Sequence, residues 1–166
     1  MDDQNIPRVL DGLDDSRQAL LDMLARMRHG LYWYTPQLCP GLYDCPEILD
    51  ALRGRIVNQP KLRFHMVLPP AREWREHCPR LAQLSARLMT ALKLRTLDRE
   101  SIPDRPELSQ AFVVADGRLL LHFSDPHRLL GRYEPKPVDR TKELSQLLQL
   151  IWDRAEPDPD LRYLGI

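Results

Sequence analysis

The stretch from residue 111 to residue 123 reads AFVVADGRLLLHF and carries the clearest structural signal in the chain. Ala111–Ala115 is one β-prone run, and Arg118–Phe123 is a second. Asp116 and Gly117 separate them, and Asp-Gly is favoured in tight hairpin turns because both residues tolerate a positive φ. The stretch therefore predicts two antiparallel strands joined by a two-residue turn.

Helical periodicity and short β-prone runs alternate outward from this hairpin. The pattern predicts helices over 15–29, 46–56, 71–92 and 144–152, strands over 31–35, 62–68 and 92–97, and loops over 36–46, 98–108 and 124–138. Strands separated by helices form parallel crossovers, and the hairpin adds antiparallel strands. The expected fold class is α/β, a three-layer domain over residues 1–155 in which helices cover both faces of a mixed sheet. Residues 156–166 are expected to form a C-terminal tail.

The composition bounds the protein without naming an activity. The chain has 166 residues, with 24 Lys and Arg against 24 Asp and Glu, so no field of one sign covers the whole molecule. No apolar run approaches the roughly 20 residues of a membrane-spanning helix. The amino terminus is polar and acidic, and the three cysteines form no even disulfide framework. These features predict a cytoplasmic protein.

The charges are unevenly placed along the chain. Residues 51–95 hold two acidic residues, Glu73 and Glu76, against ten basic ones: Arg53, Arg55, Lys61, Arg63, Arg72, Arg75, Arg80, Arg87, Lys93 and Arg95. Such a basic third is typical of a surface that binds a phosphate-rich partner. The alternative interpretation is a set of solvated helix faces that pair in space with the acidic flanks.

The predicted order of elements, ending in the Asp-Gly hairpin, resembles one half of the phospholipase D fold. That superfamily carries the motif H-x-K-x-x-x-x-D on the strand before the turn. In this frame Asp116 takes the aspartate position, Ser109 stands at the nucleophilic histidine, and Ala111 stands at the phosphate-binding lysine. The resemblance implies an imidazole nucleophile and an ammonium group, and serine and alanine supply neither. We therefore expect no catalysis of phosphodiester transfer, and Asp116 is interpreted as a turn residue.

A closer resemblance is to an uncharacterised bacterial family of single-copy, phospholipase D-like domains, sometimes fused behind a GNAT-type acetyltransferase domain. The stretches that carry it are YTPQL at 34–38, LYD at 42–44, Arg80-Leu81, Ala86-Arg87-Leu88 and DPDLRYL at 158–164. Members of that family typically have His-Arg-Leu where this chain has Pro79-Arg80-Leu81. The resemblance names a fold and no activity.

Three hypotheses for the function follow. The first is a non-catalytic binding module whose residues His77, Arg80 and Arg87 recognise a phosphate-rich ligand such as RNA, in a homodimer or with a protein partner. The second is a subunit of a cytoplasmic bacterial complex that binds only protein. The third is a phosphodiesterase that uses the relocated residues His122, Asp125 and His127.

No cofactor or metal is expected. No glycine-rich phosphate loop is present. Cys39, Cys45 and the adjacent His77 and Cys78 lack the spacing that zinc sites use.

Overall fold

The hairpin that the sequence predicts lies near the middle of a mixed sheet. The computed structural model describes residues 5–163, so the acidic amino terminus and the last residues of the predicted tail lie outside the described residues. In the hairpin, Ala115 pairs with Leu119, and the turn residues Asp116 and Gly117 adopt φ values of 56° and 68°. Both values are positive, as the Asp-Gly sequence predicts.

The sheet has eight strands within the described residues, in the order β1-β7-β6-β5-β2-β3-β4-β8. β2, β3 and β4 run parallel to one another, and the remaining neighbours pair antiparallel. The strands are β1 (Arg8–Asp11), β2 (Gly30–Tyr34), β3 (Arg63–Leu68), β4 (Leu92–Thr96), β5 (Ala111–Ala115), β6 (Leu119–Asp125), β7 (Leu130–Glu134) and β8 (Glu156–Pro157).

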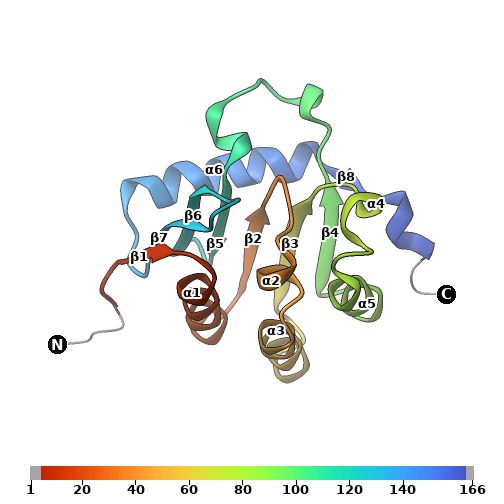
Figure 1. Cartoon of the computed structure of the whole chain (residues 1–166), viewed down its shortest axis with the longest axis horizontal. Coiled ribbons are helices and arrows are strands. Elements are labelled where there is room, and N and C mark those ends of the chain that lie inside the picture. The colour runs from red at the N-terminus through yellow and green to blue at the C-terminus, as the bar shows by residue number, and fades with distance from the viewer. Residues whose placement is uncertain (1–4, 164–166) are drawn as a thin grey trace.

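Helices cover both faces of this sheet, as Figure 1 shows. One face carries α1 (Leu13–Arg26), α2 (Pro40–Tyr43), α3 (Pro46–Asn58), α4 (Ala71–Trp74) and α5 (Pro79–Arg87), and the other carries α6 (Asp139–Arg154). Each layer buries its own apolar cluster. Leu20, Leu52 and Leu81 belong to the larger cluster beneath α1, α3 and α5, and Leu148 and Ile151 of α6 belong to the smaller one. The predicted three-layer α/β fold is confirmed.

The predicted helix over 71–92 is wrong. The structure has two helices here, α4 and α5, separated by residues 75–78. Pro79 is the first residue of α5, and a proline has no backbone N–H and clashes with the preceding helical turn. The chain therefore turns before Pro79, and His77 is exposed in the turn instead of lying on a buried stripe.

The predicted loop over 124–138 is also wrong, because it contains β7. This strand pairs with β6 on one side and with β1 on the other, and β1 was not predicted either. The predicted loop over 36–46 contains the short helix α2, and 98–108 contains the 3₁₀ turns η2 (Arg99–Ser101) and η3 (Pro106–Ser109). The alternation in β1 and β7 is too short to stand out in the sequence, and β1 pairs with a strand more than 100 residues away in the chain.

Residues 156–163 pack against the domain. Glu156 pairs with Thr96 of β4, and η4 (Pro159–Tyr163) follows. Asp158 is buried, and its carboxylate accepts the backbone N–H of Ala71 at 2.6 Å. This bond satisfies a donor in the first turn of α4, a helix terminus that otherwise lacks a partner. Within residues 5–163, no helix is long and apolar enough to cross a membrane.

Candidate functional site

The three residues predicted to stand at the phospholipase D motif positions lie on β5 or next to its ends. Ala111 is the first residue of the strand and is buried, while Ser109 is exposed in the turn before it. The Ser109 hydroxyl donates to the carbonyl oxygen of Pro106 at 3.1 Å. Asp116 follows the strand, roughly 17 Å from Ala111 at the usual rise of a strand. Neither Ser109 nor Ala111 presents an imidazole or an ammonium group at its end of β5.

Asp116 holds the connection between α1 and β2. One carboxylate oxygen accepts the backbone N–H groups of His29 at 2.8 Å and Gly30 at 3.1 Å, and the other accepts that of Arg28 at 2.8 Å. The sequence predicts that this helix continues to residue 29, but α1 ends at Arg26. These three bonds explain the earlier end. The amides are taken by the carboxylate, so they do not continue the helical ladder. Asp116 is a turn residue, and it also fixes a loop 86 to 88 residues away.

His122 lies on β6 near the beginning of β5, within a small polar cluster. Its Nε2 donates to the side-chain oxygen of Gln110 at 2.8 Å, since an amide oxygen can only accept. Burial lowers the pKa of His122, and the nearby Arg140 guanidinium lowers it further, while Glu107 acts in the opposite direction. Glu107 is itself held in ion pairs with Arg105 at 3.1 Å and Arg140 at 3.6 Å. In this cluster, burial favours the neutral form of the imidazole by lowering its pKa, and Nε2 is hydrogen-bonded to Gln110.

His127 and Asp125 form a separate local structure in the turn between β6 and β7. The Asp125 carboxylate accepts the backbone N–H of His127 at 3.1 Å and that of Arg128 at 3.3 Å. This arrangement caps a turn. His122 is hydrogen-bonded to Gln110, so it is not oriented by Asp125.

The three residues predicted to bind phosphate are on or beside α5. Arg80 and Arg87 are seven residues apart, so they lie on the same side of the helix and roughly 10 Å apart along its axis. Both are exposed, as is His77 in the turn before the helix. Arg80 also forms an ion pair with Asp44 at 3.8 Å, and the same carboxylate accepts the backbone N–H of Leu81 at 3.0 Å. We call the side chains of His77, Arg80 and Arg87 the α5 basic row.

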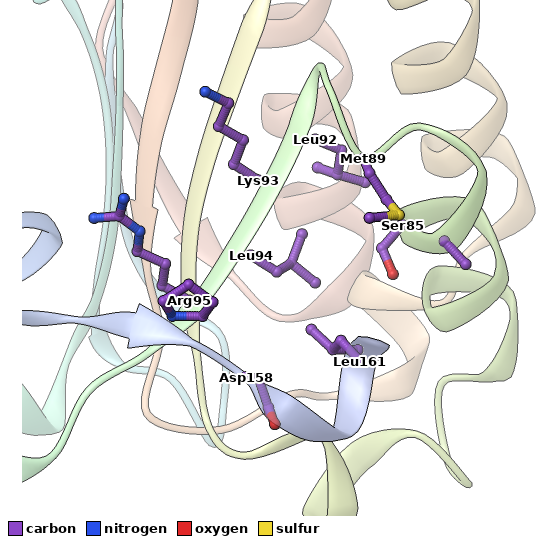
Figure 2. A pocket seen from close by; sticks show the side chains of 10 residues that line it. Ser85, Met89, Leu92, Lys93, Leu94, Arg95, Asp158 and Leu161 are labelled. Carbon is purple, nitrogen blue, oxygen red and sulfur yellow. The ribbon is translucent and has the colours of Figure 1, made fainter. Parts of the chain in front are cut away.

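A cavity at the edge of the sheet, which we call the edge cavity, was not predicted. It has a volume of about 320 Å³ and lies between α5, β4 and the C-terminal segment. Figure 2 shows Leu94 and Leu161 facing one another across it, with Met89 nearby and Lys93 directed to the other side of β4. Met89 is 65% exposed. The alternating sequence of β4 predicted a half-exposed strand. The cavity forms because β8 pairs only with Arg95 and Thr96, at the end of β4, and leaves the beginning of β4 uncovered.

The cysteines do not form a metal site. Cys39, Cys45 and Cys78 are free thiols, and burial raises the pKa of Cys78 to about 11, with Asp44 as a smaller contribution. A thiol with so high a pKa is a poor nucleophile and a poor ligand at neutral pH. Within residues 5–163, no group of three or more His, Cys, Asp or Glu residues is placed to hold a metal ion.

Several solved structures are similar to this chain in fold. The phospholipase D family member Nuc from Salmonella typhimurium is similar over 92% of this chain and 98% of its own, with 12% identity and a TM-score of 0.59. NucT from Helicobacter pylori is similar over 92% of this chain and 97% of its own, with 8% identity and a TM-score of 0.61. The chain therefore has a phospholipase D-like fold, which confirms that part of the resemblance.

TrmBL2 is a further match, and its structure is described as that of an archaeal chromatin protein with a novel mode of DNA binding. The identity is 15% and the TM-score is 0.61, with 92% of this chain covered. This chain spans 55% of the length of the TrmBL2 chain. At these identities the three likenesses show the fold alone.

The sequence itself identifies the family. Residues 12–164 match the family model described as Domain of unknown function (DUF7931), so the chain belongs to that family. The comparison with curated proteins finds no match.

Proposed function

We propose that this chain is a non-catalytic phospholipase D-like binding module that recognises a phosphate-rich polymer such as RNA. The observation that carries the proposal is the chemistry of the side chains at Ser109 and Ala111, the residues predicted to stand at the catalytic positions of the motif. Ala111 is a buried methyl group, and Ser109 is hydrogen-bonded to the backbone of its own turn. Ser109 and Ala111 would offer a phosphodiester at this end of β5 neither the imidazole nucleophile nor the ammonium group of the motif. The nearby His122 is hydrogen-bonded through Nε2 to Gln110.

The α5 basic row supports the binding part of the proposal. Arg80 and Arg87 present two guanidinium groups on one side of α5, a spacing that suits successive phosphates of a flexible strand. Asp44 neutralises part of the Arg80 charge, so Arg87 is expected to contribute more. The fold supports such a role, since TrmBL2 has a similar architecture and its structure is described as showing DNA binding.

The proposal also concerns the oligomeric state of the protein and its cellular compartment. Half-domains of the phospholipase D fold are expected to pair face to face, so we propose a homodimer or a pairing with a second protein. The three free thiols suit a reducing compartment, and we propose the cytoplasm of a bacterium. Sedimentation velocity of the full chain tests the homodimer.

The test of binding is fluorescence anisotropy of a labelled single-stranded RNA between about 50 mM and about 200 mM salt. We expect the R80A/R87A variant to bind more weakly at every salt concentration, and its salt slope to fall by about 1.4 because each lost contact to a single strand contributes about 0.7. The matched control is R128A/R132A, which removes two exposed arginines near β7, far from α5 in the sheet order. No binding by the wild type, or equal losses in the two variants, would overturn the role of the α5 basic row.

The same preparation tests the absence of catalysis. We expect no hydrolysis of bis(p-nitrophenyl) phosphate by the wild type above the level of the H122A variant. Turnover that H122A or H127A abolishes would instead support an enzyme that uses those histidines.

A second candidate function is that of a protein-interaction subunit, which the edge cavity favours. Leu92–Leu94 lies beyond the part of β4 that β8 covers, and the cavity beside it exposes Met89. An extended segment of a partner protein would add a strand to this edge and place an apolar side chain in the cavity. A partner that co-purifies with the wild type after nuclease treatment, and not with M89D, would support this function.

A further inference from the structure

A second group of basic side chains gathers around a cavity that none of the residues predicted to bind phosphate lines. The cavity has a volume of about 900 Å³ and lies where the end of α1, the last turn of α3 and the β5–β6 turn meet. Its charged lining consists of one carboxylate and five basic residues: Asp116, with Arg26, Arg28, Arg55, Arg118 and Lys136. We call it the basic cavity.

Three of these cations have no ion-pair partner among the described residues. Arg28, Arg118 and Lys136 are exposed, and no ion pair or side-chain hydrogen bond is formed by them within residues 5–163. Like charges held close together repel one another, and a bound anion relieves that repulsion. In the part of the chain that the structure describes, three positive charges without an ion pair therefore lie at the rim of one cavity.

Arg55 adds a fixed charge to the wall. Its guanidinium donates to the carbonyl oxygen of Met27 and to the side-chain oxygen of Gln59 at 3.0 Å, which ties the end of α3 to the end of α1. Its Nε–H is buried and has no partner within the described residues. A buried donor without a partner is uncommon in native proteins and calls for an acceptor. The guanidinium is thus held in place with one of its hydrogen bonds unmade.

Asp116 offsets only one of the five positive charges of the lining, so the cavity keeps an excess of positive charge. Its carboxylate accepts the three backbone N–H groups of Arg28, His29 and Gly30. These bonds also fix the backbone of Arg28, and the hairpin turn that contains Asp116 carries Arg118. The one carboxylate in the lining therefore positions two of the cations.

The lining also indicates which part of a ligand it recognises. Its non-polar residues are Ala25, Met27, Leu119 and Pro135, and its described lining contains the imidazole of His29 but no Phe, Tyr or Trp. Recognition of a nucleobase uses stacking on aromatic rings, whereas a phosphate group needs several convergent positive charges.

We propose that the basic cavity binds a terminal phosphate group, one that carries two negative charges. Arg28, Arg118 and Lys136 contact its oxygens, and Arg55 provides the charge behind them. This phosphate group is either the 5′ end of a polynucleotide or part of a small phosphorylated molecule. The proposal is independent of the α5 basic row, because His77, Arg80 and Arg87 do not line the cavity.

The experiment is calorimetric titration of the full chain, at low salt, with inorganic pyrophosphate as the probe. The test variant is R28A/R118A, which removes two exposed side chains and leaves the backbone bonds to Asp116 intact. The matched control is R80A/R87A, which removes the same net charge from α5. We expect the dissociation constant for pyrophosphate to rise by about tenfold or more in R28A/R118A, because each charge-assisted bond is strong, and to change little in R80A/R87A.

Two oligonucleotides of one sequence, with a 5′-phosphate or a 5′-hydroxyl, distinguish the sources. If the wild type prefers the 5′-phosphate oligonucleotide and R28A/R118A loses that preference, the terminal phosphate group belongs to a polynucleotide. If the wild type binds the two oligonucleotides equally and still binds pyrophosphate, the terminal phosphate group belongs to a small molecule. Absence of pyrophosphate binding by the wild type, or equal losses in the two double variants, would overturn the proposal. The proposed function fails separately, when R80A/R87A leaves RNA binding unchanged.

Discussion

Replacing Asp116 tests whether one carboxylate holds the α1–β2 connection. Its three backbone hydrogen bonds are 2.8, 2.8 and 3.1 Å long, and they are partly exposed to solvent. A partly exposed hydrogen bond of this kind stabilises a protein by about 1 kcal/mol, so D116G is expected to lose about 3 kcal/mol. D116A loses about 1 kcal/mol more, because Asp116 has a φ of 56° and a residue with a β-carbon is strained there.

The Asn variant separates the acceptor from the charge. In D116N the side-chain oxygen still accepts from His29 and Gly30, and asparagine tolerates a positive φ. The amide group replaces the oxygen that accepts from Arg28, so we expect a loss of about 1 kcal/mol. The expected order of stability is wild type, D116N, D116G and D116A.

The assay is urea unfolding, followed by circular dichroism. With a slope of about 2 kcal/mol per molar urea, the D116A midpoint falls by about 2 M. The control is D104A, which removes an 89% exposed carboxylate whose partner is Arg99 at 3.2 Å, and its loss is expected to stay below about 0.5 kcal/mol. Hydrogen exchange adds a local measurement, since the amides of residues 28–30 lose their acceptors. Equal losses in D116A and D104A would refute the reasoning.

Three further predictions concern other parts of the fold. A β-carbon at Gly131 would lie 2.0 Å from the carbonyl oxygen of His122, so G131A is expected to lose about 3 kcal/mol in urea unfolding. D158A removes the buried acceptor of the Ala71 N–H, and we expect a loss of about 2 kcal/mol together with faster proteolysis near the C-terminus. Burial lowers the pKa of His65 and of His122 below the unfolded value, so the unfolded chain binds more protons. The contribution of these two neutral histidines to the free energy of unfolding is complete above a pH of about 6.5 and is lost as the pH falls below that value. The measurement is the urea midpoint of the wild type and of H65Q/H122Q across this pH range.

Each of these predictions has a control or a contrary outcome. G54A places a β-carbon on α3 where no atom lies within 4 Å, and it should not destabilise the protein. For Asp158, a D158N variant as unstable as D158A would show that charge matters more than the hydrogen bond. For the histidines, a wild-type midpoint that rises on acidification would contradict the direction of both pKa shifts.

Local patterns predicted the central part of the fold. The hairpin at residues 111–123 was predicted from Asp-Gly between two β-prone runs, and β2, β3 and β4 were each predicted close to their observed positions. Apolar periodicity and turn residues are properties of neighbouring residues, so they can be read without the rest of the chain. The phospholipase D-like fold followed from the order of these elements, and the solved structures confirm it.

Non-local contacts decided what the sequence pattern missed. β1 joins the sheet by pairing with β7 across more than 100 residues of chain, whereas β7 also pairs with its neighbour β6. α1 ends early because Asp116 accepts the amides of residues 28–30. The edge cavity likewise exists because β8 returns to cover only part of β4.

The sequence by itself determined the α/β class and the Asp-Gly hairpin, and it predicted that Ser109 and Ala111 stand at the catalytic positions of the phospholipase D motif. It also showed that residues 51–95, which contain the α5 basic row, are rich in basic residues. Only the tertiary structure brought Arg28, Arg55, Arg118 and Lys136 to one cavity, because they come from four segments far apart in the chain. Charge summed along a sequence averages over such residues, whereas an electrostatic field depends on their distances in space.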